Sequence, residues 1–263
     1  MKIYGFCDTL IPAMPLTSYN KDFKWWPCDD ENTYDPINNA YGPNDITYSF
    51  NSNGFRCDNF NIESDKRILF LGCSHTNGIG LPLEHTWPYI LLGYINKETD
   101  YNIPLWNLAT GGVGLDTQVR LYYHYGLKLK PQLVFGYFPA YRRELYYNDD
   151  RWLAPFNSSH PKINFDNIPY IVDPRIIHYE TEKNMCFLDI MLKMNNTKMI
   201  HNNWTLYGEA EPIYDNFQIR HNINLHFDKK ARDKLHCGHA SHVKFAKEIF
   251  ENYKDIIIET LKN

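Results

Sequence analysis

From about residue 63 onward, short apolar runs alternate with longer stretches in which apolar side chains recur every three or four positions. The apolar runs at 67–72, 104–108 and 131–138 are brief and are bounded by glycine, proline or polar residues, and a more polar stretch at 198–204 follows the third helical segment. Runs of this kind are typical of strands that are buried on both faces. We therefore predict four strands at these positions.

Four helices are predicted between and after these strands, at 86–94, 114–127, 182–194 and 241–261. The first begins with Thr86 as N-cap and carries Pro88 in its first turn. The last has the most regular apolar stripe, formed by Val243, Ala246, Phe250, Tyr253, Ile257 and Leu261. Strands that alternate with helices in this way predict βαβ units and a mostly parallel sheet.

Two segments depart from this rhythm. Residues 1–62 contain five prolines, several Asn-containing turns and only one short alternating stretch, at 46–50. We predict an irregular N-terminal extension there, packed on a core domain that covers 63–263. Residues 139–180 are rich in Tyr, Arg, Asn and Pro, and we interpret them as an insertion over one end of the sheet.

The composition limits the class of protein. With 263 residues, 43% hydrophobic and 22% charged, the chain is long enough for one large domain and is neither disordered nor fibrous. Its net charge of −4 argues against a polybasic surface, so we predict no nucleic-acid partner. Aromatic residues reach 16% in a chain also rich in Asn. An AT-rich gene explains this better than a sugar-binding face, although both remain compatible with it.

The sequence has no apolar run of 18 residues, so we predict no membrane span. Its first residues make a poor signal peptide, because Cys7-Asp8 and two prolines interrupt the apolar stretch. The six cysteines are far apart and form no C-x-x-C pair. We therefore expect free thiols and a cytoplasmic or otherwise non-secreted protein.

Three positions offer candidate chemistry, each of them weak when taken alone. Ser74 follows the first strand, at the carboxyl edge where open α/β sheets bind ligands. Asp233 precedes His236 by three residues, so its carboxylate can reach the imidazole Nδ1–H. A glycine-rich loop at 107–114 follows the second strand. The simpler interpretations are a turn serine, a solvated turn and a flexible loop.

Together, these positions follow the order Ser, Asp, His of the α/β-hydrolases, but the G-x-S-x-G elbow is missing, since Thr76 lies two residues after Ser74. Instead, they resemble the SGNH (GDSL-type) hydrolases in the Gly-x-Ser-His variant. Four segments carry the resemblance: 68–78 (ILFLGCSHTNG), Asn107 with Gly112, 233–238 (DKLHCG), and 48–56 (YSFNSNGFR), which is similar to an Asn-Ser-x-Gly-Phe-Arg element of some members.

The resemblance implies a three-layer α/β/α, flavodoxin-like fold with a parallel central sheet and ester hydrolysis without a metal or organic cofactor. Ser74 would attack the acyl carbon, His236 would act as general base, and Asp233 would orient the imidazole. The backbone N–H groups of Ser74 and Gly112 would form the oxyanion hole. The expected substrate is a small acyl ester, such as an O-acetyl group on a saccharide.

The chain departs from the family pattern after the third strand. A third oxyanion donor, the Asn of a Gly-x-Asn-Asp block, is expected there, but Tyr141 occupies about that position. Loss of one such donor typically lowers the rate by about 10²–10³-fold. Arg142 and Arg143 are the nearest groups that could supply the charge, and a solvated or salt-bridged loop is an equally good interpretation of this stretch.

Three alternatives stay open. His236, Cys237, His239 and His242 are close in sequence and could suggest zinc, but their spacing straddles a turn and a helix start. The missing Asn and the aromatic excess would also fit a catalytically inactive scaffold that binds carbohydrate or has a structural role. The same site could instead transfer the acyl group to a sugar hydroxyl.

The pair Trp25-Trp26 fits the edge of a core better than a sugar-stacking site.

Overall fold

The computed structural model covers the whole chain. The residues that the structure describes are 22–25, 29, 31–34, 37, 40–111, 113–139, 146–148, 151–153, 174–204, 218–220, 223–225 and 230–262.

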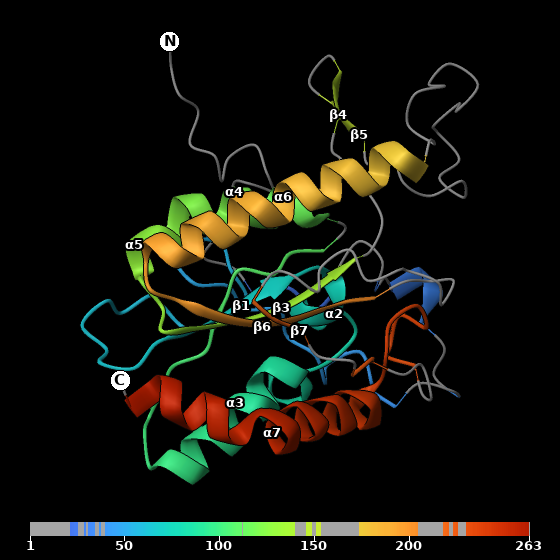
Figure 1. Ribbon diagram of the computed structural model, residues 1–263. Coiled ribbons are helices and arrows are strands. Elements are labelled where there is room, and N and C mark those ends of the chain that lie inside the picture. Colours follow the sequence, from blue (N-terminus) through green and yellow to red (C-terminus); the bar gives the residue numbers. More distant parts are fainter. Residues whose placement is uncertain are drawn as a thin grey trace.

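A five-stranded parallel sheet forms the centre of the fold (Figure 1). Its strand order is β2-β1-β3-β6-β7, which is the 2-1-3-4-5 order of flavodoxin-like proteins. The strands are β1 (Ile68–Gly72), β2 (Trp106–Asn107), β3 (Leu133–Pro139), β6 (Lys198–Trp204) and β7 (Ile219–Arg220). In register, Ile68 lies opposite Leu133, which lies opposite Lys198.

Helices cover both faces of this sheet (Figure 1). One face carries α4 (Leu115–Leu121), α5 (Leu127–Leu129) and α6 (Pro174–Met194). The other carries α3 (Trp87–Thr99) and α7 (His239–Lys262), which pack against each other. The three-layer α/β/α arrangement with a parallel central sheet confirms the predicted fold class.

Successive strand residues point into different cores. Leu69 and Leu71 belong to the cluster beneath α4 and α6, whereas Ile68 and Phe70 belong to the cluster beneath α3 and α7. All residues of β1 and β3 are buried as a result. This double burial explains why β1 and β3 are continuous apolar runs in the sequence.

The four predicted strands are present, with small differences in length. Residues 198–204 form β6 over the full predicted range, but the second strand is reduced to the two residues of β2. The two-residue strand β7 was not predicted, because so short an element has no periodic pattern. Within the predicted insertion, β4 (Tyr146–Asn148) and β5 (Arg151–Leu153) form an antiparallel pair.

Three helices differ from their predicted bounds by more than two residues, and one of them, α3, ends at Thr99, five residues beyond the predicted end at 94. α6 begins eight residues earlier than predicted, at Pro174, where proline is favoured as the first helical residue. The helix predicted at 114–127 is interrupted by η3, one turn of π-helix (Tyr122–Gly126). Gly126 permits this turn, because a Cβ there would lie 2.3 Å from Cδ2 of Tyr122.

The start of α3 is capped differently from the prediction. Thr86 is the N-cap residue, but its hydroxyl donates to the carbonyl of Leu83 at 2.7 Å. The first helical N–H, from Trp87, donates instead to Nδ1 of His242 at 2.9 Å. His242 is fully buried in the first turn of α7, so it joins the two helices through one neutral imidazole.

This imidazole is expected to make stability depend on pH. Burial, followed by the neighbouring His236 and His239, lowers the pKa of His242 from 6.5 to about 3. Between these values the unfolded chain binds more protons, so stability falls as the pH falls below 6.5. A His242→Asn variant, whose amide oxygen can still accept from Trp87, should lose this dependence.

The measurement is urea unfolding of both proteins at pH 7 and pH 5. We expect the wild type to lose about 2 kcal/mol more than the variant over this interval. Equal losses would show that His242 does not titrate between the folded and unfolded states.

Residues 40–60 of the N-terminal segment pack into the core beneath α4. Ile46, Tyr48 and Phe55 are buried there, and Tyr48 forms an antiparallel bridge with Phe23. The domain division at residue 62 stays a prediction. Among the described residues, none of the helices has the length and apolar composition of a membrane span, and Cys57, Cys73, Cys186 and Cys237 form no disulfide.

Candidate active site

Ser74 begins the short helix α2 (Ser74–Asn77), directly after β1 at the carboxyl edge of the sheet. The carbonyl of Cys73 accepts the N–H groups of Thr76 and Asn77 at 3.0 and 2.9 Å, which fixes the tight turn. Gly72 makes this turn possible, because a Cβ there would lie 2.8 Å from the backbone oxygen of Tyr137. The N–H of Ser74, in the first turn of the helix, has no acceptor within it.

Asp233 and His236 are in contact, as the spacing predicted. Oδ2 of Asp233 is hydrogen-bonded to Nδ1 of His236, while Oδ1 accepts the backbone N–H groups of Leu235 and His236, each at 3.1 Å. The Asp233 side chain is fully buried, and that of His236 is 13% exposed. A buried carboxylate therefore holds the imidazole with its other nitrogen available for chemistry.

The loops that carry Ser74 and His236 pack against each other. The N–H of Arg232 donates to the carbonyl of Gly80 at 3.0 Å. Gly80 has a φ of +79°, and a Cβ there would lie 2.8 Å from Cβ of Ala231 and 3.1 Å from Oδ1 of Asp233. The close approach of the two loops thus requires glycine at position 80.

His75 and His236 bring the two loops into ring contact. Their ring centroids lie 5.0 Å apart in an edge-to-face arrangement, and His75 also contacts Trp204, at the end of β6, with 4.6 Å between ring centroids. Three segments distant in sequence therefore converge beside Ser74. The sequence alone did not decide whether His75 lies near the site, and the structure places it there.

The Ser74 hydroxyl points toward Sγ of Cys73, at 4.0 Å. Among the described residues it makes no hydrogen bond to His236. Rotation about χ1 moves a serine hydroxyl between staggered positions, and catalytic hydrogen bonds often tighten only when substrate is bound.

The loop after β2 is tied to the serine turn by two asparagines. Nδ2 of Asn77 donates to the carbonyl of Ala109 at 2.9 Å, and Nδ2 of Asn107 donates to the carbonyl of Thr76 at 3.1 Å. The N–H of Thr110 reaches the carbonyl of Gly72 at 3.3 Å. These bonds hold residues 107–110 beside Ser74.

Two predicted oxyanion groups cannot be placed. Gly112 lies outside the described residues, and so does Arg142, together with its neighbours Tyr141 and Arg143. Their proximity to Ser74 stays a prediction.

Trp26 also lies outside the described part of the chain, whereas Trp25 stacks on Arg232, with 4.2 Å between the guanidinium carbon and the ring centroid.

Arg56 has a function at the site that its motif alone did not reveal. It is 1% exposed, and it donates to the carbonyls of Asn77, Gly78 and Leu81 at 3.2, 2.7 and 2.7 Å. Burial lowers the pKa of this guanidinium to about 10, so it stays charged at neutral pH. The Asn-Ser-x-Gly-Phe-Arg element therefore supplies a buried cation that fastens the chain leaving the serine turn.

A second missed feature is the buried pair of Asp29 and Arg232. Arg232 Nη2 lies 2.6 Å from Asp29 Oδ2, and Nε lies 2.9 Å from Oδ1. The position of Arg232 next to Asp233 was a possible signal in the sequence. Asp29, more than 200 residues away, offered none.

Of the histidines considered for zinc, His236 lies in the loop before α7, and His239 and His242 lie in the first turn of that helix. In the described part of the chain, no group of three or more His, Cys, Asp or Glu side chains could hold a metal ion. His242 Nδ1 is used as the acceptor for Trp87, and His239 stacks on His85 with ring centroids 3.9 Å apart. Burial, with the neighbouring His85, lowers the pKa of His239 below its ordinary value.

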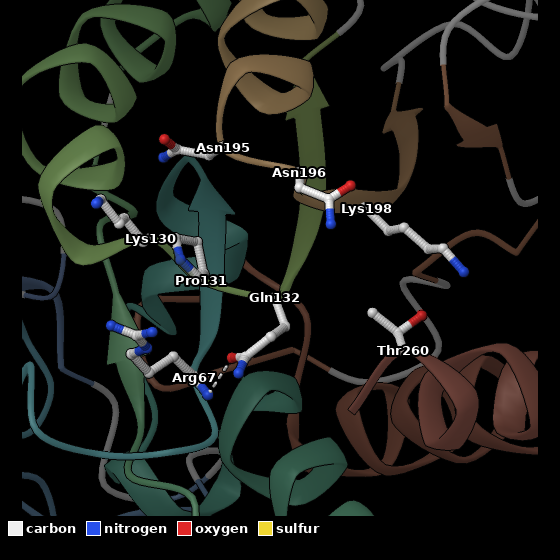
Figure 2. Close-up of a pocket in the computed structure, with 8 residues that line it drawn as sticks. All are labelled: Arg67, Lys130, Pro131, Gln132, Asn195, Asn196, Lys198 and Thr260. Atoms are coloured by element: carbon white, nitrogen blue, oxygen red, sulfur yellow. Dashed lines mark hydrogen bonds between the residues drawn. The ribbon is translucent and has the colours of Figure 1, made fainter. Parts of the chain in front are cut away.

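A cavity of about 360 Å³ lies at the other, amino edge of the sheet (Figure 2). Arg67, Lys130 and Lys198 line it, and Figure 2 shows the first two on the opposite side of Gln132 from Lys198. The cavity also adjoins the C-terminal ends of α5, α6 and α7, whose carbonyl dipoles favour nearby cations. We therefore assign these charges to helix ends and not to the candidate active site.

No family model matches the sequence, and no curated protein matches it. Among solved structures, the chain is similar to TesA (12% identity, 73% of this chain and 99% of that chain, TM-score 0.49). It is also similar to the psychrotrophic esterase EstA from Pseudoalteromonas sp., with 16% identity over 73% of this chain and 98% of that chain and a TM-score of 0.44. A carbohydrate acetylesterase family member from Sinorhizobium meliloti is similar as well, with 11% identity over 74% of this chain and 99% of that chain and a TM-score of 0.45. These are likenesses of fold, and membership of the SGNH family stays a prediction from the motifs.

Proposed function

We propose that the protein is a serine esterase that hydrolyses small acyl esters. The observation that carries this proposal is the buried Asp233 carboxylate on Nδ1 of His236, in a loop packed against the turn that bears Ser74. A nucleophile, a base and an orienting acid within one corner of the sheet are the components of serine acyl transfer.

In the proposed reaction, Oγ of Ser74 attacks the acyl carbon while Nε2 of His236 takes its proton. The tetrahedral intermediate then collapses, and the imidazolium returns the proton to the departing alcohol. A water molecule attacks the acyl-enzyme in the same way, which releases the acid and restores Ser74. Asp233 stays ionised throughout and stabilises the imidazolium.

The oxyanion of each tetrahedral intermediate needs donors that are in place before the reaction. We assign the N–H of Ser74 and, from the resemblance, the N–H of Gly112. Arg142 is our candidate for the third group, because the expected Asn is replaced in this sequence. The bonds from Asn77 and Asn107 support this part of the proposal, since they hold residues 107–110, which precede Gly112 in the sequence, beside the serine turn.

Two points concern the substrate class and the alternatives. O-acetyl groups on saccharides stay our first candidates for the substrate, on the basis of the family resemblance. The Ser74 hydroxyl, turned toward Cys73, is the observation that favours the alternative of an inactive carbohydrate-binding scaffold. Acyl transfer would share the first half of the reaction and differ in the final acceptor.

Covalent capture separates these alternatives. A fluorophosphonate should label the wild-type protein at Ser74, located by peptide mass spectrometry, because a base-activated serine attacks phosphorus irreversibly. Absence of labelling after prolonged exposure would support the inactive scaffold. If Ser74 is labelled, the untreated protein is then assayed for release of acetate from acetylated saccharides, with and without an added sugar acceptor. This comparison distinguishes hydrolysis from acyl transfer.

A further inference from the structure

Asp29 is a buried carboxylate in the N-terminal extension, far in sequence from the candidate active site. Its side chain is 1% exposed. It accepts hydrogen bonds from Arg232 and from the hydroxyl of Tyr48, the latter at 2.6 Å. These two partners lead to different loops of the site.

The first partner, Arg232, precedes Asp233 in the sequence, and hydrogen bonds and an aromatic ring hold its guanidinium group. Its remaining guanidinium N–H groups donate to the carbonyls of Lys24 at 2.6 Å and Gly42 at 2.9 Å, and the face of the group lies over Trp25. Asp29 and these extension carbonyls therefore fix the side chain next to the residue that orients His236.

The second partner, Tyr48, reaches the loop that follows Ser74. Its oxygen accepts the N–H of Gly80 at 2.8 Å while its hydroxyl donates to Asp29. Burial, and then the charge of Asp29, raise the pKa of Tyr48, so the phenol keeps the proton that it donates. Because the carbonyl of Gly80 accepts the N–H of Arg232, the two arms meet at one residue.

We propose that Asp29 is a positioning residue, which sets the separation of Ser74 from the Asp233–His236 pair by acting through Arg232 and Tyr48. This inference rests on the proposed function for its catalytic consequence. A buried ion pair is weak evidence for added stability, because desolvation of both charges offsets their attraction. Its value here is geometric, since one carboxylate ties together the two loops whose spacing the reaction requires.

Asp29→Asn tests the catalytic consequence with a side chain of nearly the same shape. We expect kcat for p-nitrophenyl acetate, per site titrated with fluorophosphonate, to fall by about tenfold or more, because small displacements of reacting groups are costly. KM should change less than twofold. The matched control is Asp189→Asn, which alters another buried carboxylate, on α6, that is hydrogen-bonded to Lys193 and Gln218, and this variant should keep its kcat per site.

The per-site measurement separates positioning from folding. A purely structural role would reduce the number of titratable sites and the melting temperature, but each remaining site would react at the wild-type rate. That result for Asp29→Asn would overturn the proposal. If the variant folds poorly, Tyr48→Phe removes only the arm to Gly80 and should still lower kcat per site.

Hydrogen exchange tests the connection without any reliance on activity. In Asp29→Asn the amides of both Gly80 and Arg232 should exchange faster, whereas Tyr48→Phe should affect Gly80 more than Arg232. Asp189→Asn should change neither. Unchanged protection at both amides in Asp29→Asn would refute the connection, whereas an unlabelled wild-type Ser74 would instead refute the proposed function.

Discussion

Replacement of Ser74 by Ala is expected to lower kcat/KM for p-nitrophenyl acetate by about 10³-fold or more. The alanine removes the atom that forms the acyl-enzyme, and the other members of the site then have no nucleophile to activate. Ser74 is 5% exposed in a compact turn, so loss of one oxygen should leave the fold intact. Initial rates over a range of ester concentrations give the comparison.

The matched control for this variant is Ser241→Ala. Ser241 is also a buried serine, 2% exposed in the first turn of α7, and its hydroxyl has no hydrogen-bond partner among the residues that the structure describes. Its replacement should change the rate less than twofold. Equal hydrolysis by Ser74→Ala and the wild type, at matched protein concentration, would show that the ester is cleaved elsewhere or by another group.

Asp233→Asn is expected to lower kcat by about 10⁴-fold, the size of effect found when the orienting carboxylate of a Ser-His-Asp triad becomes an amide. The amide oxygen can keep the bonds from the N–H groups of Leu235 and His236. The amide nitrogen would then face Nδ1 of His236 and donate to it. The imidazole proton would be placed on Nε2, where it blocks the base that Ser74 needs.

Nitrogen NMR of His236 distinguishes this explanation from a general loss of structure. In the wild type at neutral pH, Nδ1 should carry the proton, and in Asp233→Asn Nε2 should carry it, with the remaining spectrum little changed. A variant that keeps the Nδ1–H tautomer, or a kcat within tenfold of the wild type, would contradict the role assigned to Asp233.

Local features of this protein were predictable because short-range physics decides them. β1 was recognisable from a continuous apolar run, and the long α7 was recognisable from three- and four-residue spacing of apolar residues. The contact of Asp233 with His236 follows from a separation of three residues in a turn. The serine turn was predicted from a glycine at the end of a buried strand. Elements without a repeating pattern, such as β7 and the π turn at Tyr122–Gly126, were missed.

The sequence by itself therefore determined the parallel α/β fold, the serine turn and the Asp-His pair. Only the tertiary structure decided how the turn and the pair meet. Asp29 reaches Arg232 across 203 residues, and Trp87 reaches His242 across 155. The physical reason is that these groups are chosen by burial, where each buried charge or N–H needs a partner, and the identity of that partner depends on the packing of distant segments and not on local spacing.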